Sequence, residues 1–494
     1  MKYPNIIFFR NSKYEHIDSY LNENKDKLLC TLHITDDKNF LNNLFDSNYP
    51  LLITFGDTED EYYSDIYSII ATRMQKRWIH LKYIENIDIF NSSVNYCFIN
   101  NVCMNSESTN VTFSVFTTCY NSYQKIIRAY NSLKEQIFKD WEWVILDDSS
   151  DDEHFKFLKN TLEKDKRIRL YKRSSNSGNI GNVKNEVVSL CRGKYLIELD
   201  HDDEILPCTL LDSTNVFDKN PEIGFIYMDF INIYENNDNF NYGNFFGLGY
   251  AGYYNQKYKN KWVYVASTPN INNITLTHIV SVPNHPRIWR KDSLLKIGNY
   301  SIFLPISDDY HLLLKTAVNL KMAKIHKLGY VQYMNNNNNN FSYIRNSEIN
   351  RLCVKHIKPQ AFIDYNINEK MKELDAYEDE IYIRNHSKIW ERTDFTHKYC
   401  NKIINVNYDK IYCIISLDLF KKKIDLIRSL YIDTKNDFLL LDNSCECSDL
   451  WKFLDENQFD RIKCYAIKGT TNDQLINYFH LIYKSLDNHE IISP

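Results

Sequence analysis

The chain has 494 residues, 44% of them hydrophobic, and its 59 Lys and Arg residues against 64 Asp and Glu residues give a formal net charge of −5. This length exceeds what a single hydrophobic core usually serves, so we expect two to four globular domains. The slightly acidic balance, with no block of Lys and Arg, argues against nucleic acid as a partner.

Targeting and redox signals point to a soluble chain. The N-terminal apolar run is too short for a signal peptide, and no apolar run reaches the roughly eighteen residues that a membrane span needs. The twelve cysteines include no Cys-x-x-Cys pair, which favours reduced thiols over disulfides or a zinc site. We therefore expect a cytoplasmic protein without a signal peptide or transmembrane segment.

The first block of the chain, residues 1–105, alternates strand-like and helical patterns. Its apolar runs are "NIIFF", "LLCTLHI", "PLLITFG" and "RWIHLKYI". Between the last two, apolar residues recur at helical spacing at Tyr62, Tyr63, Ile66, Ile69 and Ile70. This alternation predicts a small α/β domain that ends in the polar stretch "CMNSESTN".

The second block, residues 106–345, has a longer β-α-β-α-β pattern. The strand "VTFSVFTTCYN" precedes a helix with an apolar face, and the strand "WVIL" then ends in Asp147 and Asp148. After "RIRLYK" and a further helix, the strand in "GKYLIELDHDDEILP" ends at Asp200. Open α/β sheets bind ligands at the carboxyl ends of their strands, so both acidic strand ends are candidate binding positions.

Three aspartates and a histidine are crowded at the second strand end. Asp200, His201, Asp202 and Asp203 follow one another directly after an apolar run. Neighbouring carboxylates repel and raise one another's pKa, so such a turn calls for a counter-charge, for which a divalent cation is the obvious candidate. The alternative from the residues alone is an acidic surface turn, with His201 a structural hydrogen-bonding residue.

The last block, residues 409–494, repeats part of the second. "FLLLDNSCECSDLWKFL" followed by "RIKCY" parallels "WVILDDSSDDEHFKFL" followed by "RIRLY". Asn443 stands where Asp148 stood, and no counterpart of the carboxylate turn follows. We interpret this block as a degenerate partial duplication that serves packing or homo-oligomerisation, so its deletion should leave donor chemistry in any soluble product. Residues 346–408 are predicted to be a helical linker region.

Several ordered motifs in the second block resemble one family. "FTTCYN", "VILDDSSDD", "NSGNIGNVKNEVVSLCRGKYLIELDHDD", "NHPRIWRKDSLLKIGNYS" and "ISDDYHLLLKTA" occur in the order of the motifs of the family 2 glycosyltransferases. The resemblance spans residues 111–345, about half of the chain. It implies a GT-A (Rossmann-like) nucleotide-sugar-binding domain, so the predicted fold is a central α/β GT-A domain flanked by two smaller α/β domains.

The resemblance also implies roles at the donor side of the site. Asp202 would ligate Mn²⁺ or Mg²⁺, which stabilises the charge of the leaving diphosphate. Asp200 would contact the ribose, while Asp147 and Asp148 would recognise the base and ribose of the nucleotide. Further donor-site positions are Thr118, Tyr120, Asn176, Lys184 and Asn185.

The acceptor side is implied by the later motifs. Helical periodicity places Asp308 and Asp309 at a helix N-terminus, which alone would be an N-cap, but the match to the family's Glu-Asp motif assigns Asp309 as general base. Asp308 would take the Glu position. Arg287 and Trp289 would shape the acceptor side, although a core role is the alternative for the tryptophan.

One departure from the family pattern concerns the metal. Many relatives carry a histidine after the last core strand, where this chain has the asparagine-rich stretch "YVQYMNNNNNNFSYIRN". His326 lies too early in the sequence to replace it. The third metal ligand is therefore not predicted.

The implied function is an inverting, metal-dependent hexosyltransferase that moves a sugar from a UDP-sugar to a hydroxyl of a glycan or glycoconjugate. Two other classes stay open. A sugar nucleotidyltransferase would share the α/β sheet and metal carboxylates, but the sequence lacks a Gly-rich triphosphate loop. A catalytically silent interaction protein would fit the degenerate third block.

Overall fold

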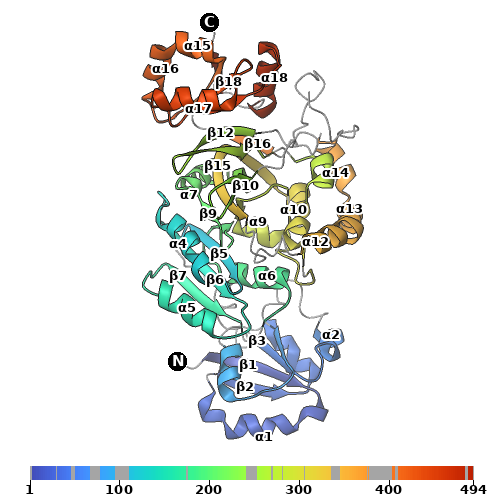
Figure 1. The fold of residues 1–494 in the computed structure, drawn as a ribbon. Helices are drawn as coiled ribbons and strands as arrows, with labels where there is room; N and C mark the ends of the chain where they lie inside the picture. The colour runs from blue at the N-terminus through green and yellow to red at the C-terminus, as the bar shows by residue number, and fades with distance from the viewer. Residues whose placement is uncertain are drawn as a thin grey trace. The chain divides into compact units, whose positions relative to one another are not determined.

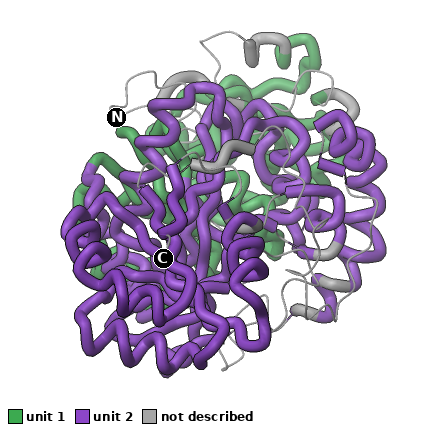
Figure 2. The backbone as a smooth tube through the Cα atoms, turned by 90° about the horizontal axis from the view of Figure 1, so that it is seen from above, with its two compact units in different colours: residues 1–123, 140–196 green, residues 124–139, 197–494 purple. Residues whose placement is uncertain are grey.

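The structure is a computed structural model, and it falls into two compact units (Figure 2). Residues 1–123 and 140–196 form the first unit, and residues 124–139 and 197–494 form the second. The described residues are 3–28, 30–45, 51–66, 78–94, 111–173, 176–240, 253–268, 271–280, 282–304, 306–334, 345–374, 376–377, 403–406, 410–483 and 488–492.

The first unit begins with a four-stranded parallel sheet. Its order is β2-β1-β3-β4, and every neighbouring pair of strands runs parallel (Figure 1). The elements are β1 (Tyr3–Arg10), α1 (His16–Glu23), β2 (Cys30–Thr35), β3 (Leu51–Phe55), α2 (Asp60–Ile66) and β4 (Trp78–Leu81), with 3-10 turns at Ser12–Tyr14, Lys25–Lys27 and Lys38–Phe45. Of the predicted helical stripe, Tyr62 and Ile66 are buried. Ile69 and Ile70, and the boundary near residue 105, lie outside the described residues.

The same unit contains the start of the β-α-β pattern. Strands β5 (Phe113–Cys119), β6 (Trp141–Asp147) and β7 (Ile168–Lys172) pair in parallel, in this order. The segments between them include α5 (Glu153–Leu162), and α6 (Ile180–Leu190) leads from β7 to β8 (Tyr195–Glu198). Strand β6 is buried along its whole length, as its apolar sequence predicts. Asp147 is the last residue of β6 and Asp148 follows it, so both lie at the carboxyl end of the strands of this sheet.

Two long parallel strands form the centre of the second unit. β10 (Ile223–Tyr234) pairs with β15 (Lys321–Met334) along nearly its full length, and the two lie side by side in Figure 1. Around them are the 3-10 turn Tyr123–Lys125, α4 (Ile126–Lys134), β9 (Glu204–Ile205), α7 (Thr209–Lys219), β11 (Asn239–Phe240), β12 (Tyr253–Tyr258), β13 (Lys261–Ala266), α8 (Asn273–His278), β14 (Arg287–Arg290), α9 (Lys291–Lys296) and α10 (Asp308–Asn319). Antiparallel pairing of β14 with β10 fixes the position of Arg287.

The predicted linker region packs on the second unit where it is described. It contains α12 (Asn346–Leu352), a π-helical turn (Cys353–Ile357), α13 (Lys358–Asp364), α14 (Ile367–Glu373) and β16 (Ile403–Val406). Ile367 and Met371 of α14 are fully buried, and this helix contacts α8 and α10 (Figure 1). Residues 346–374 are therefore a helical cover and not a free tether.

The C-terminal block repeats the local structure of the second block. Strands β18 (Asn436–Asp442) and β19 (Lys463–Ala466) are parallel and joined through α17 (Cys447–Glu456), as β6 and β7 are joined through α5. Asp442 accepts a hydrogen bond from the Ser444 amide (2.7 Å), as Asp147 does from the Ser149 amide (3.0 Å). The remaining elements are β17 (Lys410–Ile415), α15 (Leu417–Lys422), α16 (Ile424–Tyr431), α18 (Asn472–Tyr483) and β20 (His489–Ile492).

This block shares a hydrophobic core with the rest of the second unit, unlike a self-contained domain. Its edge strand β19 pairs with β12 at Asn255 and Cys464. One buried cluster combines Ile231, Ile233, Tyr254, Val263 and Val331 with Ile411, Cys413, Leu439, Leu475, Tyr478 and Phe479. The Tyr478 hydroxyl also donates to the Tyr253 carbonyl oxygen (2.5 Å). The predicted α/β class is confirmed, whereas the boundaries proposed for the separate domains stay predictions.

Two further observations concern the cysteines and the helices. All nine cysteines among the described residues are free thiols. In the part of the chain that the structure describes, no helix combines the length and apolar character needed to cross a bilayer.

Candidate active site

Asp147 and Asp148 differ in their surroundings although they are neighbours. Asp147 is fully buried, and its Oδ1 contacts His154 Nδ1 (2.9 Å) and the Ser149 amide (3.0 Å). Burial would raise the pKa of Asp147, but the hydrogen bonds from His154 and Ser149 outweigh it and hold the pKa below its ordinary value. Asp147 therefore orders the loop after β6 as an ionised acceptor at neutral pH.

Asp148 lies nearer the surface, and three donor groups contact its carboxylate. Its Oδ1 accepts from the Ser177 amide (2.9 Å) and pairs with Arg173 Nε (3.1 Å), and its Oδ2 accepts from Asn176 Nδ2 (3.2 Å). Burial nevertheless raises the pKa of Asp148 to about 6, because desolvation outweighs the Ser177 bond and the Arg173 charge. The structure thus brings together Asp148 and Asn176, two of the predicted donor-site residues, and their role there stays a prediction.

The other donor-side candidates occupy less distinctive places. Thr118 is half-buried near the end of β5, and Tyr120 is 53% exposed just after it. Lys184 and Asn185 lie on α6, where Lys184 is buried. Their contacts do not assign these four residues a role, so their place in the donor site stays a prediction.

The carboxylate turn follows β8 directly. Asp203 is buried and accepts hydrogen bonds from the Tyr330 hydroxyl (2.9 Å) and the Tyr333 amide (2.8 Å). Burial, together with the charges of Asp202 and Asp200, raises the pKa of Asp203 well above its ordinary value. Asp203 therefore holds the turn against β15, and the repulsion expected from the sequence is present.

Asp200 and Asp202 are the two carboxylates of the turn left for a ligand. The Asp202 carbonyl accepts from Arg128 Nη1 (2.7 Å), and the Asp202 residue is 9% exposed. The Asp200 side chain is 37% exposed. This arrangement supports a site at the turn, in which the backbone is fixed while two carboxylate groups remain available.

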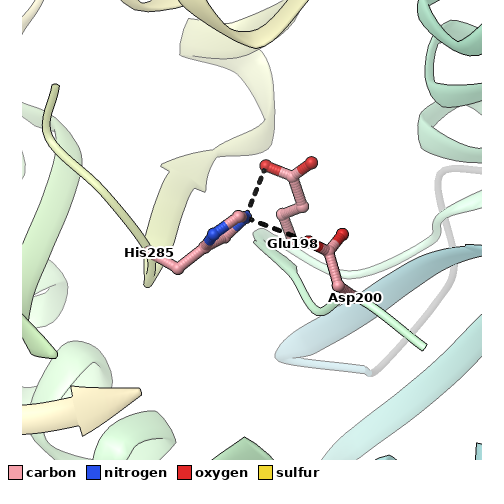
Figure 3. Close-up of side chains that lie close together, drawn as sticks. All are labelled: Glu198, Asp200 and His285. Atoms are coloured by element: carbon pink, nitrogen blue, oxygen red, sulfur yellow. Dashed lines mark ion pairs between the residues drawn. The ribbon is translucent and has the colours of Figure 1, made fainter. Parts of the chain in front are cut away.

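A cluster that the sequence did not predict surrounds Asp200. Glu198 lies at the end of β8, and His285 lies shortly before β14. Each of these residues and Asp200 offers one possible metal-ligand atom, and the three atoms lie within 4.8 Å of one another (Figure 3). His285 Nε2 lies 3.4 Å from Glu198 Oε2 and 4.0 Å from Asp200 Oδ2. Two carboxylates and an imidazole are a donor set suited to a divalent cation, so these residues fit the metal that the resemblance implies.

The predicted base lies at the other end of a buried ion-pair chain. Arg287 is 3% exposed and donates from Nη1 to Glu198 Oε2 (3.1 Å) and from Nη2 to Asp309 Oδ2 (2.9 Å). Burial would lower the pKa of Arg287, but the carboxylates of Asp309 and Glu198 raise it above its ordinary value. Arg287 thus stays charged and links the strand before the carboxylate turn to the first turn of α10.

The other acceptor-side candidates, Asp308 and Trp289, are more deeply buried than Asp309. Asp308 is 3% exposed, whereas the Asp309 side chain is 22% exposed and can meet a substrate. Trp289 is fully buried, 5.0 Å from the Phe225 ring centroid, and donates from Nε1 to Thr316 Oγ1 (3.2 Å). Its position is that of a core tryptophan. His326 is also buried, with its ring 5.2 Å from that of Tyr483 in the C-terminal block.

Part of the chain that contains this site matches a known protein family. Residues 114–291 match the sequence model described as Glycosyl transferase family 2. This segment contains the β-α-β pattern, the carboxylate turn and β14. Residues 114–291 are therefore similar to the family 2 glycosyltransferases, as the motifs predicted.

Individual relatives match over the same part of the chain. The O-antigen biosynthesis protein RfbC of Myxococcus xanthus is 30% identical over 118 residues, which are 24% of this chain and 9% of RfbC. Chondroitin synthase of Escherichia coli is 31% identical over 114 residues, 23% of this chain and 16% of that protein. The chain therefore spans only a small part of these relatives' length.

A solved structure is similar at a lower level. S. aureus TarS 1–349 in complex with UDP-GlcNAc is 20% identical, covering 45% of this chain and 59% of that chain, with a TM-score of 0.35.

Proposed function

We propose that the chain is an inverting, metal-dependent glycosyltransferase that moves a sugar from a UDP-sugar to a hydroxyl group of a glycan or glycoconjugate. The observation that carries this proposal is the carboxylate turn, which directly follows β8 inside the family 2 domain. The names of two relatives, an O-antigen biosynthesis protein and a chondroitin synthase, support a glycan as the acceptor.

The proposed chemistry divides between two groups of residues. Asp148, with Asn176 beside it, would accept a hydrogen bond from the base of the nucleotide. Asp309 would take the proton of the acceptor hydroxyl while the hydroxyl oxygen bonds to the anomeric carbon. The bond from that carbon to the diphosphate breaks at the same time, which inverts the configuration. A divalent cation, when bound, would neutralise the charge of the leaving diphosphate, and the resemblance assigns it to Asp202.

The function is tested by screening nucleotide-sugars for turnover. We expect UDP release from at least one UDP-sugar in the presence of Mn²⁺, and none when EDTA removes the metal, because the leaving diphosphate needs a counter-charge. Absence of turnover and of binding across UDP-, GDP- and TDP-sugars would contradict the proposal and favour a catalytically silent protein.

We expect UDP to bind more tightly with Mn²⁺ than without it. Carboxylates of the turn would hold the cation, which would supply positive charge for the phosphates of the nucleotide, so each ligand would raise the affinity for the other. Isothermal titration calorimetry with UDP, once with Mn²⁺ and once with EDTA, measures the difference. Equal affinities under the two conditions would show that no cation contributes to nucleotide binding.

Affinity for a UDP-sugar should fall as the pH is lowered from about 7.5 to 5. The pKa of Asp148 is raised to about 6, so the carboxylate that accepts from the base is charged at neutral pH and protonated at pH 5. Losing a hydrogen bond to a charged group costs about 1.5–3 kcal/mol, or at least tenfold in affinity. UDP-GlcNAc is a suitable probe because its diphosphate is a diester without the second ionisation near pH 6 of a terminal phosphate.

The matched control is Asp148→Asn, which keeps the size of the side chain but does not titrate. Both proteins are titrated in EDTA, because a histidine at a metal site would add its own pH dependence when a cation is bound. The affinity of Asp148→Asn should then be low and independent of pH over this range. A pH dependence that survives in Asp148→Asn would assign the effect to another group.

A further inference from the structure

We propose that Asp200 and His285 are the protein's ligands for the catalytic cation, with Glu198 beside them, and that the ion is Mn²⁺ rather than Mg²⁺. This inference deepens the proposed function, because it assigns the metal to residues that the resemblance does not. Asp200 comes from the turn after β8, and His285 comes from the segment between α8 and β14 (Figure 3).

The environment of the His285 side chain is the observation that points to a bound cation. The residue is 8% exposed, and its Nε2 atom is buried without a hydrogen-bond partner. Figure 3 shows the ring edge facing both carboxylates. The 3.4 Å approach to Glu198 Oε2 is an ion-pair distance without hydrogen-bond alignment. A buried polar nitrogen without a bonded partner is costly, and a bound cation would remove that cost.

The distances match those between ligands of one ion. An octahedral ion with bonds of about 2.1 Å holds adjacent ligand atoms about 3 Å apart and opposite ones about 4.2 Å apart. The 3.4 Å and 4.0 Å separations of Nε2 from Glu198 Oε2 and Asp200 Oδ2 fall within these limits. Small side-chain adjustments are therefore sufficient to bring the three atoms around one cation.

The ring of His285 is held in place before any ion binds. It stacks on Tyr330, with centroids 4.7 Å apart and planes 19° from parallel. Tyr330 in turn donates to Asp203 in the carboxylate turn (2.9 Å). The stack therefore orients the imidazole toward the turn, so little rotamer freedom is lost on binding.

The local charges favour a cation at Asp200 over one centred on Glu198. Glu198 already shares a buried ion pair with Arg287, which balances its charge and repels another cation from that side. Among the described residues, the only ion-pair partner of the Asp200 carboxylate is His285 at 4.0 Å. Asp200 and His285 are therefore the primary ligands, and Glu198 the adjacent one.

The donor set also decides between the two metals. Mg²⁺ prefers oxygen ligands and keeps much of its water, whereas an imidazole nitrogen is a softer donor that binds Mn²⁺ more strongly. His285 therefore predicts selectivity for Mn²⁺. The missing histidine after the last core strand is replaced by one from another segment of the chain.

The test is Mn²⁺ binding to the full chain, measured by electron paramagnetic resonance with Mn²⁺ alone and with Mn²⁺ plus UDP. His285→Phe keeps an aromatic ring to stack on Tyr330 but removes the nitrogen, and Asp200→Asn removes the carboxylate charge. We expect each to weaken Mn²⁺ binding at least tenfold. The echo-envelope modulation from a directly bound imidazole nitrogen should be present in the wild type and absent in His285→Phe.

His201→Ala is the matched control, since His201 lies in the same turn but outside the cluster, and it should bind Mn²⁺ like the wild type. Thermal melting confirms that each variant is folded. Wild-type Mn²⁺ affinity in His285→Phe and Asp200→Asn, with loss only in Asp202→Asn, would overturn this assignment in favour of Asp202. A wild type that binds no Mn²⁺ with or without UDP would also overturn it. Mn²⁺ bound as expected without turnover of any nucleotide-sugar would contradict the proposed function alone.

Discussion

Asp309→Asn should lower the rate of sugar transfer by about 10²–10⁴-fold, the range typical for removal of a general base. The asparagine keeps the size of the side chain and some hydrogen bonding, but it cannot accept the proton of the acceptor hydroxyl. Nucleotide affinity should barely change, because a base must face the acceptor, on the opposite side of the anomeric carbon from the diphosphate. Transfer rates and UDP calorimetry on the same preparation separate the two effects.

The fold should tolerate this change. Asp309 is partly exposed, and Arg287 keeps its ion pair with Glu198 when the Asp309 charge is lost. Asp308→Asn is the control at the adjacent position. If Asp309→Asn retains near-normal transfer while Asp308→Asn abolishes it, the match of "SDDYH" to the Glu-Asp motif is displaced and the assigned base is wrong.

Deletion of residues 409–494 should prevent stable folding of the second unit. The deletion would expose Ile231, Ile233, Tyr254, Val263 and Val331, which are at most 2% exposed in the full chain. At about 1.5–3 kcal/mol for each buried large apolar side chain, the loss is about 10 kcal/mol, comparable with the whole stability of a typical domain. Circular dichroism and solubility of the 1–408 fragment measure this, and a cooperative melting transition at the wild-type temperature would contradict it.

A pair of leucines tests the same interface in the full chain. Leu475 on α18 is fully buried in the shared cluster, whereas Leu426 on α16 is 47% exposed. Leu475→Ala should lower the free energy of unfolding by about 2–5 kcal/mol, and Leu426→Ala by less than about 0.5 kcal/mol. Equal effects of the two substitutions would mean that the shared core contributes little to stability.

The parts of the fold that the sequence predicted are those determined by local patterns. Apolar runs with alternating helical stripes located β5, β6, β7 and β8, and the acidic residues after β6 and β8 occur at strand ends as expected. Asp308 and Asp309 lie in the first turn of α10, where the pattern of apolar residues placed them. Each of these features depends on residues a few positions apart.

The features that were missed depend on contacts between distant segments. His285 is 8% exposed and meets Asp200 through tertiary contacts that bring the segment before β14 to the carboxylate turn, and helical or strand periodicity does not predict such contacts. A histidine within "NHPRIWRK", a motif already quoted, was the available signal. The hydrophobic core that the C-terminal block shares with β10, β12, β13 and β15 was missed for the same reason, since its buried faces could not be told apart from those of an independent domain.

The ion-pair chain through Arg287 has a consequence for sequence change. One buried guanidinium balances two carboxylates, Glu198 next to the carboxylate turn and Asp309 at the proposed base. Exchange of Arg287 for a neutral residue would remove the shared counter-charge of the buried Glu198 and the partly exposed Asp309, which favours a change at these two positions as well. Natural variation at these three positions should therefore be correlated, and a lineage that abandons acceptor chemistry should lose all three charges together.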